Sequence, residues 1–367
     1  DTMQIVKLLT LFVAAAVFTQ GAGPHHDRWR LVADRLITTP VADYPFNWGE
    51  GVQQIGLMKI YERTRDPRYL AYMEKWTAQF LSEDPKVLLN VDGADRRRRE
   101  GYCGHWSPGT AVLLLWKAKR RPEYRKLAEA VNDFIVNSAE RSGEGALGHW
   151  KGSHQMWVDT LYMACPLLAA LGKERRQPAW VDDAANQIIV FAKYLQDERS
   201  GLFYHLYDWE KKERTTSLWA RGNGWVLMSI ADTMEMMGRG HAHYAALRSI
   251  ATRLAAGLAH VQDADGMFHT VLDDPSSYAE TSASMRFTYG LLKLVRLNVL
   301  PSAGNVGISS KAWSAVNEKY VQNGVVTGVS AGTGPGDAAN YKARPVGRET
   351  WGTGACLMAG YEVDRRK

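Results

Sequence analysis

The carboxylate at position 159 is the strongest candidate for acid–base chemistry in this chain. Asp159 follows Trp157 by two residues and begins an apolar, helix-like run that includes Tyr162. Apolar surroundings raise the pKa of a carboxylic acid, which suits a general acid, whereas a helix N-terminus favours the anion. The same position also suits a helix N-cap, so residue type and spacing support catalysis and capping equally.

A second cluster combines a guanidinium with two glycines, in the run Arg221-Gly222-Asn223-Gly224-Trp225. The planar fork of Arg matches the two oxygens of a carboxylate, and Gly lets a ligand approach the backbone closely. Glycines also relieve crowding between packed helices. Because Gly costs a helix stability, we favour ligand contact for Arg221, Asn223 and Trp225.

Further polar and aromatic residues lie at related positions. His149 and His205 each follow a turn glycine by four residues, which predicts equivalent places on a rim. Glu280 could bind sugar hydroxyls or cap the next helix, and His105 is equally ambiguous. The 13 Trp residues favour a sugar-binding groove because indole faces stack on sugars, although most Trp residues are expected in the core. Trp48 and Trp157 are the groove candidates.

The elements that carry these residues follow from a repeat. An aromatic residue comes two positions before a small or polar residue in six places, which are 54, 55, 62, 59 and 73 residues apart: Trp48, Tyr102, Trp157, Trp219, Tyr278 and Trp351. A period of this size predicts one ring of stacked helical hairpins, an all-α (α/α)6 toroid formed by residues 24–367 as a single domain. The segment 301–343 breaks the period, and its role stays open.

Outer and inner helices are expected to alternate. Pro67, Pro122 and Pro178 each precede an apolar stripe and should begin outer helices, and a similar helix should begin near Tyr244. The inner helices should then point their N-termini at one face of the ring. Because helix N-termini carry partial positive charge, that face would accept an anionic substrate.

The N-terminal residues 1–23 resemble a targeting segment. Asp1 and Thr2 precede Met3 and look like added residues; Lys7, an apolar run and Gly21-Ala22-Gly23 follow. This is the pattern of a secretory signal peptide, so we expect an extracellular protein with no membrane association after cleavage.

The charge balance gives a weak indication of partners. The net charge of +6 and the run 96–99 of four arginines could steer an acidic polysaccharide, or the run could be a solvated loop. The secretion signal disfavours nucleic acid, and we expect a monomer. The cysteines number three, an odd count that excludes a fully paired framework, and His241-x-His243 is too small a set for a metal site.

The run 156–168, Met-Trp-Val-Asp-Thr-Leu-Tyr-Met-Ala-Cys-Pro-Leu-Leu, resembles the signature of glycoside hydrolase family 105, the unsaturated rhamnogalacturonyl hydrolases. The related family 88 of unsaturated glucuronyl hydrolases shares the plan. Residues 221–225, 278–283 and 352–355 extend the resemblance, which runs from about Trp29 to Tyr361. It implies a six-hairpin hydrolase that acts on 4,5-unsaturated uronic acids left by polysaccharide lyases, without metal or cofactor.

The resemblance also implies roles for single residues. Asp159 would protonate C4 of the double bond before water adds at C5; His205, Arg221 and Trp225 would contact the unsaturated uronide. The family has a second essential Asp, but Gly104 stands at the matching position; Asp92, Asp95 or His105 could take over its role. This departure keeps two alternatives open, a carbohydrate-binding toroid that has lost catalysis and another toroid enzyme such as a sugar epimerase. The sugar that follows the uronide is not indicated.

Overall fold

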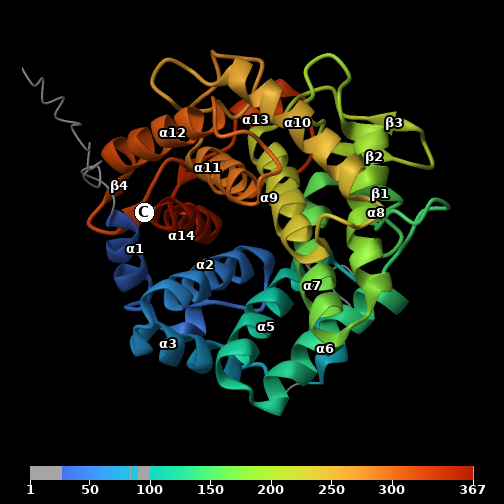
Figure 1. Ribbon diagram of the computed structural model, residues 1–367, viewed down its shortest axis with the longest axis vertical. Coiled ribbons are helices and arrows are strands. Elements are labelled where there is room, and N and C mark those ends of the chain that lie inside the picture. Colours follow the sequence, from blue (N-terminus) through green and yellow to red (C-terminus); the bar gives the residue numbers. More distant parts are fainter. Residues whose placement is uncertain (1–26, 83, 90–99, 367) are drawn as a thin grey trace, which may run out of the picture.

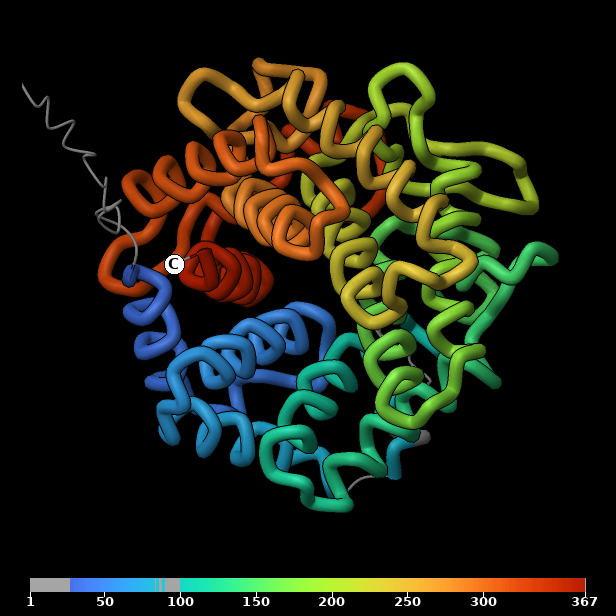
Figure 2. The backbone as a smooth tube through the Cα atoms, viewed as in Figure 1, coloured from blue at the N-terminus to red at the C-terminus, as the bar shows by residue number. Residues whose placement is uncertain are grey.

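The computed structural model describes residues 27–82, 84–89 and 100–366 as a ring of two concentric helical layers (Figures 1 and 2). Within these residues, six inner helices surround the axis: α2 (Trp48–Thr64), α5 (Ser107–Lys119), α7 (Val158–Arg175), α9 (Ala220–Met237), α11 (Thr281–Arg296) and α14 (Thr350–Asp364). Outer helices precede them: α1 (Arg28–Leu36), α3 (Pro67–Ala78), α6 (Pro122–Asn137), α8 (Pro178–Leu195), α10 (Tyr244–Val261) and α12 (Asn305–Lys319). The (α/α)6 toroid is confirmed.

The ring closes between the two ends of the described chain. Each inner helix contacts the next, and α14 packs against α2, the first inner helix (Figure 1). The inner helices are apolar on nearly every side because they are covered by neighbours all round: 13 of the 18 residues of α7 are buried. The outer helices bury one stripe only, such as Tyr124, Leu127, Val131 and Phe134 on α6.

The predicted outer-helix starts are correct. α3, α6 and α8 begin at Pro67, Pro122 and Pro178, and α10 begins at Tyr244. Proline suits the first helical turn because its missing N–H would have no intrahelical partner there. Short helical pieces complete the set: η1 (Val41–Asp43), α4 (Pro85–Leu89), η2 (Cys103–His105) and α13 (Ala338–Lys342).

Short strands stitch the loops above the inner-helix N-termini. β1 (Gln155–Trp157), β2 (Leu206–Asp208) and β3 (Glu213–Arg214) form one antiparallel sheet, with Trp157 opposite Leu206. The C-terminal connection carries the pairs β4 (Val321–Gln322) with β5 (Val325–Val326) and β6 (Val329–Ser330) with β7 (Val346–Gly347). No described strand exceeds three residues, so helices form the core.

The expectation that the six aromatic motifs share one helical position is wrong in detail. Trp157 and Trp219 are both N-caps, so Asp159 and Arg221 occupy the same position in α7 and α9. Trp48 is instead the first residue of α2, and Glu280 is itself the N-cap of α11. The motif therefore identifies where inner helices begin, but only α7 and α9 place its third residue identically.

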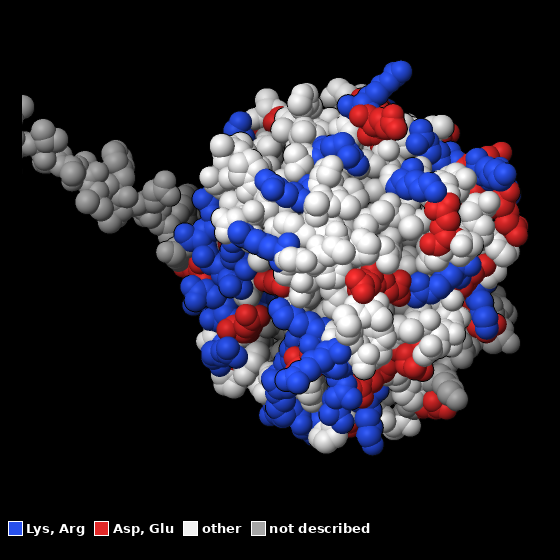
Figure 3. All heavy atoms as spheres, turned by 45° about the vertical axis from the view of Figure 1, so that its right-hand side comes forward, with Lys and Arg blue, Asp and Glu red and all other residues white. Residues whose placement is uncertain are grey.

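Charge is unevenly distributed on the surface, and Lys and Arg side chains gather on the lower left in Figure 3. None of the helices in the described ranges is long and apolar enough to cross a membrane. The predicted signal segment 1–23, the arginine run 96–99, Asp92 and Asp95 all lie outside the described residues.

Candidate active site

The first backbone N–H groups of successive inner-helix motifs are tied to the next hairpin in a repeated way. Val158 N donates to the carbonyl of His205 at 3.0 Å, and Ala220 N donates to the carbonyl of Thr270 at 2.9 Å. Cys103 N makes the same bond to His149, at 3.0 Å. The predicted equivalence of the loop positions is therefore confirmed, and each loop residue lies beside the start of the preceding inner helix.

A pocket of about 420 Å³ opens where the inner helices begin. Its walls are largely aromatic, with Trp48, Tyr102, Trp150 and Trp157, and Asp159 is the single carboxylate among its described lining residues. The remaining lining residues are Asn47, Cys103, Gly104, His149, Met163, Arg221, Gly332, Thr333 and Gly334. Most of the other Trp side chains, such as Trp76 and Trp106, are core residues, as expected.

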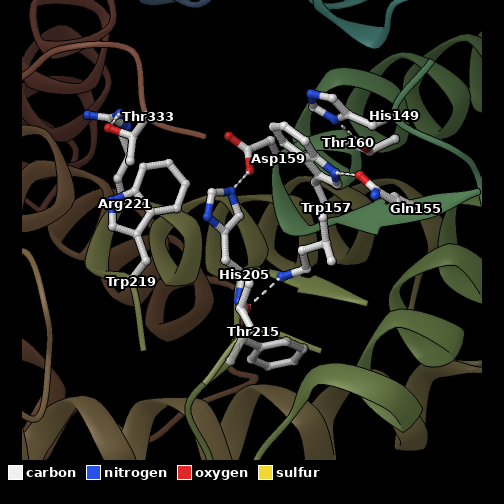
Figure 4. Close-up of polar contacts among 12 residues, drawn as sticks. His149, Gln155, Trp157, Asp159, Thr160, His205, Thr215, Trp219, Arg221 and Thr333 are labelled. Atoms are coloured by element: carbon white, nitrogen blue, oxygen red, sulfur yellow. Dashed lines mark hydrogen bonds and ion pairs between the residues drawn. The ribbon is translucent and has the colours of Figure 1, made fainter. Parts of the chain in front are cut away.

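Asp159 and His205 meet through the β1–β2 pairing, which sets their loops side by side (Figure 4). His205 Nε2 lies 2.9 Å from Asp159 Oδ2, and the His205 side chain is fully buried. His205 Nδ1 lies 2.9 Å from the hydroxyl of Tyr341, which accepts a hydrogen bond from Gly336 N. With Tyr341 donating to Nδ1, the Nε2–H donates to Asp159, so the C-terminal segment fixes the imidazole tautomer.

The electrostatics of Asp159 resolve the competition that the sequence leaves open. Burial raises the pKa of Asp159, but the charge and hydrogen bond of His205, with smaller contributions from His149 and Arg221, outweigh it. The net pKa lies below the ordinary value, so the carboxylate is ionised at neutral pH. A negative ligand beside it would raise this pKa and favour protonation.

Arg221 lines the pocket, but its fork is turned toward the C-terminal connection. Nη1 donates to the carbonyl and hydroxyl of Ser330, and Nη2 donates to Ala331 O at 2.9 Å and Thr333 Oγ1 at 2.8 Å. The predicted two-oxygen grip on a substrate carboxylate is therefore not available in this arrangement. Arg221 instead holds the wall formed by residues 332–334 and supplies positive charge opposite Trp157 (Figure 4).

His149 occupies the other side of the pocket. Its ring stacks on Trp157 with centroids 4.0 Å apart, and Nδ1 lies 2.9 Å from Thr160 Oγ1 and 3.2 Å from Cys103 Sγ. Trp157 is held in turn by Gln155, which accepts from its indole N–H at 2.9 Å. Trp48 and Trp157 therefore lie where a sugar ring could stack, as predicted for both.

Four predicted contact residues do not line the pocket. Asn223 is buried and bonds both backbone groups of Phe203, which fixes the loop before α9. Trp225 lies one turn deeper than Arg221, stacked on Tyr162. The other two residues support pocket walls: Glu280 caps α11 and accepts from Ser330 N at 3.0 Å, and His105 packs edge-on against Tyr102.

Several pocket residues had no signal in the sequence. Tyr341 and Thr333 lie in the segment that breaks the period, and Asn47 precedes the first motif. Among the residues that the structure describes, no three His, Cys, Asp or Glu side chains are grouped to hold a metal ion. The thiols of Cys103, Cys165 and Cys356 are buried and, in the described chain, form no disulfide.

A toroid of six helical hairpins with an aromatic, acid-containing pocket at the inner-helix N-termini defines a carbohydrate-active protein of the six-hairpin class. The chain belongs to Glycosyl Hydrolase Family 88, whose model matches residues 29–367. The resemblance inferred from the motifs is thus confirmed.

Known relatives agree with this membership. The chain is 28% identical over 346 residues to the unsaturated rhamnogalacturonyl hydrolase YesR of Bacillus subtilis, covering 92% of this chain and 95% of that protein. It is 25% identical to an unsaturated 3S-rhamnoglycuronyl hydrolase of Formosa agariphila, with coverage of 87% and 84%. A Clostridium acetobutylicum (C. acetobutylicum) glycoside hydrolase structure from family 105 superposes with a TM-score of 0.82 at 29% identity, covering 92% of this chain and 99% of that one.

Proposed function

We propose that the protein removes a 4,5-unsaturated uronic acid from the non-reducing end of lyase-generated oligosaccharides, with pectin-derived rhamnogalacturonan fragments as its substrates. The observation that carries this proposal is the Asp159 carboxylate, buried beside His205 in a pocket walled by Trp48 and Trp157. Family membership and the likeness to rhamnogalacturonyl hydrolase YesR support the substrate class.

The chemistry follows from the charge balance of the pocket. A bound uronate brings a negative charge toward Asp159, which raises the pKa of its carboxyl group and favours the acid form. Asp159 then donates its proton to C4 of the enol ether, and water adds at C5 and returns a proton to the carboxylate. The resulting hemiketal opens and the sugar on the reducing side leaves. Arg221 offsets the charge of the uronate.

The test is a panel of oligosaccharides made by rhamnogalacturonan, pectin and glycosaminoglycan lyases. Turnover consumes the conjugated double bond, so ultraviolet absorbance falls with time. We expect the fastest loss with the rhamnogalacturonan fragment; the glycosaminoglycan fragments test the alternative of a glucuronyl hydrolase. No loss with any fragment would contradict the proposal.

A second candidate rests on one observation, the absence of a side chain at Gly104 beside the pocket. On this alternative the toroid binds unsaturated sugars without turning them over. Calorimetry that detects binding of the unsaturated disaccharide, with no change in absorbance over hours, would favour it.

We further propose that the protein is secreted and monomeric. The supporting feature for secretion is the charged, apolar and small-residue order of residues 7–23. N-terminal sequencing of protein from the culture medium should find a start just after residues 21–23, and light scattering should give the mass of one chain. Retention in the cell with an intact N-terminus would contradict secretion, and a dimer mass would contradict the monomer.

A further inference from the structure

The structure contains the Asp159–His205 arrangement a second time, with the carboxylate missing. The bond from Val158 N to His205 O places Asp159 beside His205, and the matching bond from Cys103 N to His149 O places Gly104 beside His149. Gly104 is thus equivalent to Asp159 in backbone position, and both residues line the pocket. The question is which group presents polar chemistry where position 104 has none.

The ring of Tyr102 occupies that place. A Cβ atom on Gly104 would lie 2.3 Å from Cε1 and 2.7 Å from Cζ of Tyr102, so ring and side chain exclude each other. The ring is held edge-on by His149 and His105, with centroids 5.4 Å and 5.6 Å away. Glycine at 104 is therefore the condition for the Tyr102 ring to lie where it does.

The Tyr102 hydroxyl is chemically uncommitted. Tyr102 lines the pocket, and among the described residues no hydrogen bond to its hydroxyl is formed. Burial raises the pKa of Tyr102 well above its ordinary value, with further contributions from Cys103 and Asp159. The phenol therefore stays protonated and can donate a hydrogen bond, but it cannot act as a second base at neutral pH.

We propose that the Tyr102 phenol is a substrate-binding group that donates a hydrogen bond to the uronide at the place that Gly104 leaves open. The pocket then works with one carboxylate, Asp159, and one neutral donor in place of a pair of carboxylates. This inference rests on the proposed function, because the uronide is the substrate that the donor would contact.

The first test is Tyr102→Phe, which keeps the ring and removes only the hydroxyl. Loss of one hydrogen bond to the substrate should lower kcat/KM on the unsaturated galacturonyl–rhamnose disaccharide about tenfold, with the fold unchanged by circular dichroism. A value of kcat/KM close to that of the unaltered chain would overturn the proposal.

The second test exchanges the two groups. Gly104→Asp alone should lose activity because its Cβ collides with the Tyr102 ring. The double variant Tyr102→Ala/Gly104→Asp restores a polar group beside His149 without the collision. We expect its kcat/KM to exceed that of the matched control Tyr102→Ala/Gly104→Ala about tenfold. Equal activity of these double variants would mean that no polar group is needed at this place, against the proposal.

A separate measurement distinguishes failure of this inference from failure of the proposed function. If the unaltered protein consumes none of the lyase products, the proposed function fails. Calorimetric binding of the unsaturated disaccharide to the unaltered protein and to Tyr102→Phe then tests the donor itself. Weaker binding to the variant supports the contact, and equal affinity, or no binding to either protein, overturns it.

Discussion

Replacing His205 by alanine tests the electrostatics of the pocket most directly. The change removes the 2.9 Å hydrogen bond from His205 Nε2 to the Asp159 carboxylate, where the histidine is fully buried. A hydrogen bond to a charged group contributes about 1.5–3 kcal/mol. We expect the free energy of unfolding at neutral pH to fall by at least that amount, with a further loss from the cavity left against the Trp219 ring.

The loss should depend on pH in a defined direction. Although burial raises the pKa of Asp159, His205 lowers it further, so the folded-state pKa lies below the unfolded one. Such a group stabilises the fold above the ordinary Asp pKa of about 3.9, and the stabilisation is lost as the pH falls through the folded-state pKa. The cavity costs the same at every pH. His205→Ala should therefore destabilise the protein more at neutral pH than in acid.

Urea denaturation at several pH values measures the stability, and kcat/KM on the unsaturated disaccharide measures the chemistry. Without His205 the pKa of Asp159 rises, so the alkaline fall of kcat/KM should move to higher pH, although the rate at the optimum falls because Asp159 is less well positioned. His205→Gln, which can keep a neutral donor, is the matched control and should show a smaller loss of stability. An alkaline limb that stays in place in both variants would refute the coupling of Asp159 to His205.

Three further variants probe separate parts of the molecule. Asp159→Asn should lower kcat at least about 100-fold while the unfolding transition stays cooperative; activity close to normal would contradict its role as the acid. Arg221→Lys keeps the charge but loses the hydrogen bonds to residues 330–333, so we expect about 1–3 kcal/mol less stability in urea and a higher KM, and an unchanged KM would argue against a wall held by Arg221. Lys293 Nζ lies 2.6 Å from both Asp232 and Glu235 in the interior, so Lys293→Met should cost about 3–5 kcal/mol in thermal or urea unfolding without changing KM; a stable variant would show that the pair is not needed.

The sequence was most informative where the repeat is regular. Pro67, Pro122 and Pro178 predicted outer-helix starts because proline has a defined place in the first turn. His149 and His205 were predicted to share a loop position, and the repeated bonds to the preceding inner helices show that they do. The β1–β2 pairing that joins His205 to Asp159 could not be foreseen, because strands of three residues leave no pattern of alternation.

Helix geometry explains the residues that were misplaced. Arg221, Asn223 and Trp225 lie within five residues, but successive helical residues point in different directions. Arg221 reaches the pocket, Trp225 lies one turn deeper on Tyr162, and Asn223 faces the loop at Phe203. A motif on a helix therefore predicts the site as a whole better than it predicts the contact made by each residue.

Tyr341 and Thr333 were missed for a different reason. They lie in the connection between α12 and α14, which departs from the repeat, so no equivalent residue elsewhere in the chain marks them. Their contacts with His205 and Arg221 span more than a hundred residues, a distance over which sequence spacing carries no information.

Those long-range contacts have a consequence for biosynthesis. A ribosome delivers Asp159, His205 and Arg221 well before residues 330–341, which hold Arg221 and set the histidine tautomer. A chain cut short before this stretch would carry the acid but lack the groups that adjust it. Catalytic competence therefore arises only as translation finishes, and prematurely terminated products should be inert toward polysaccharide fragments.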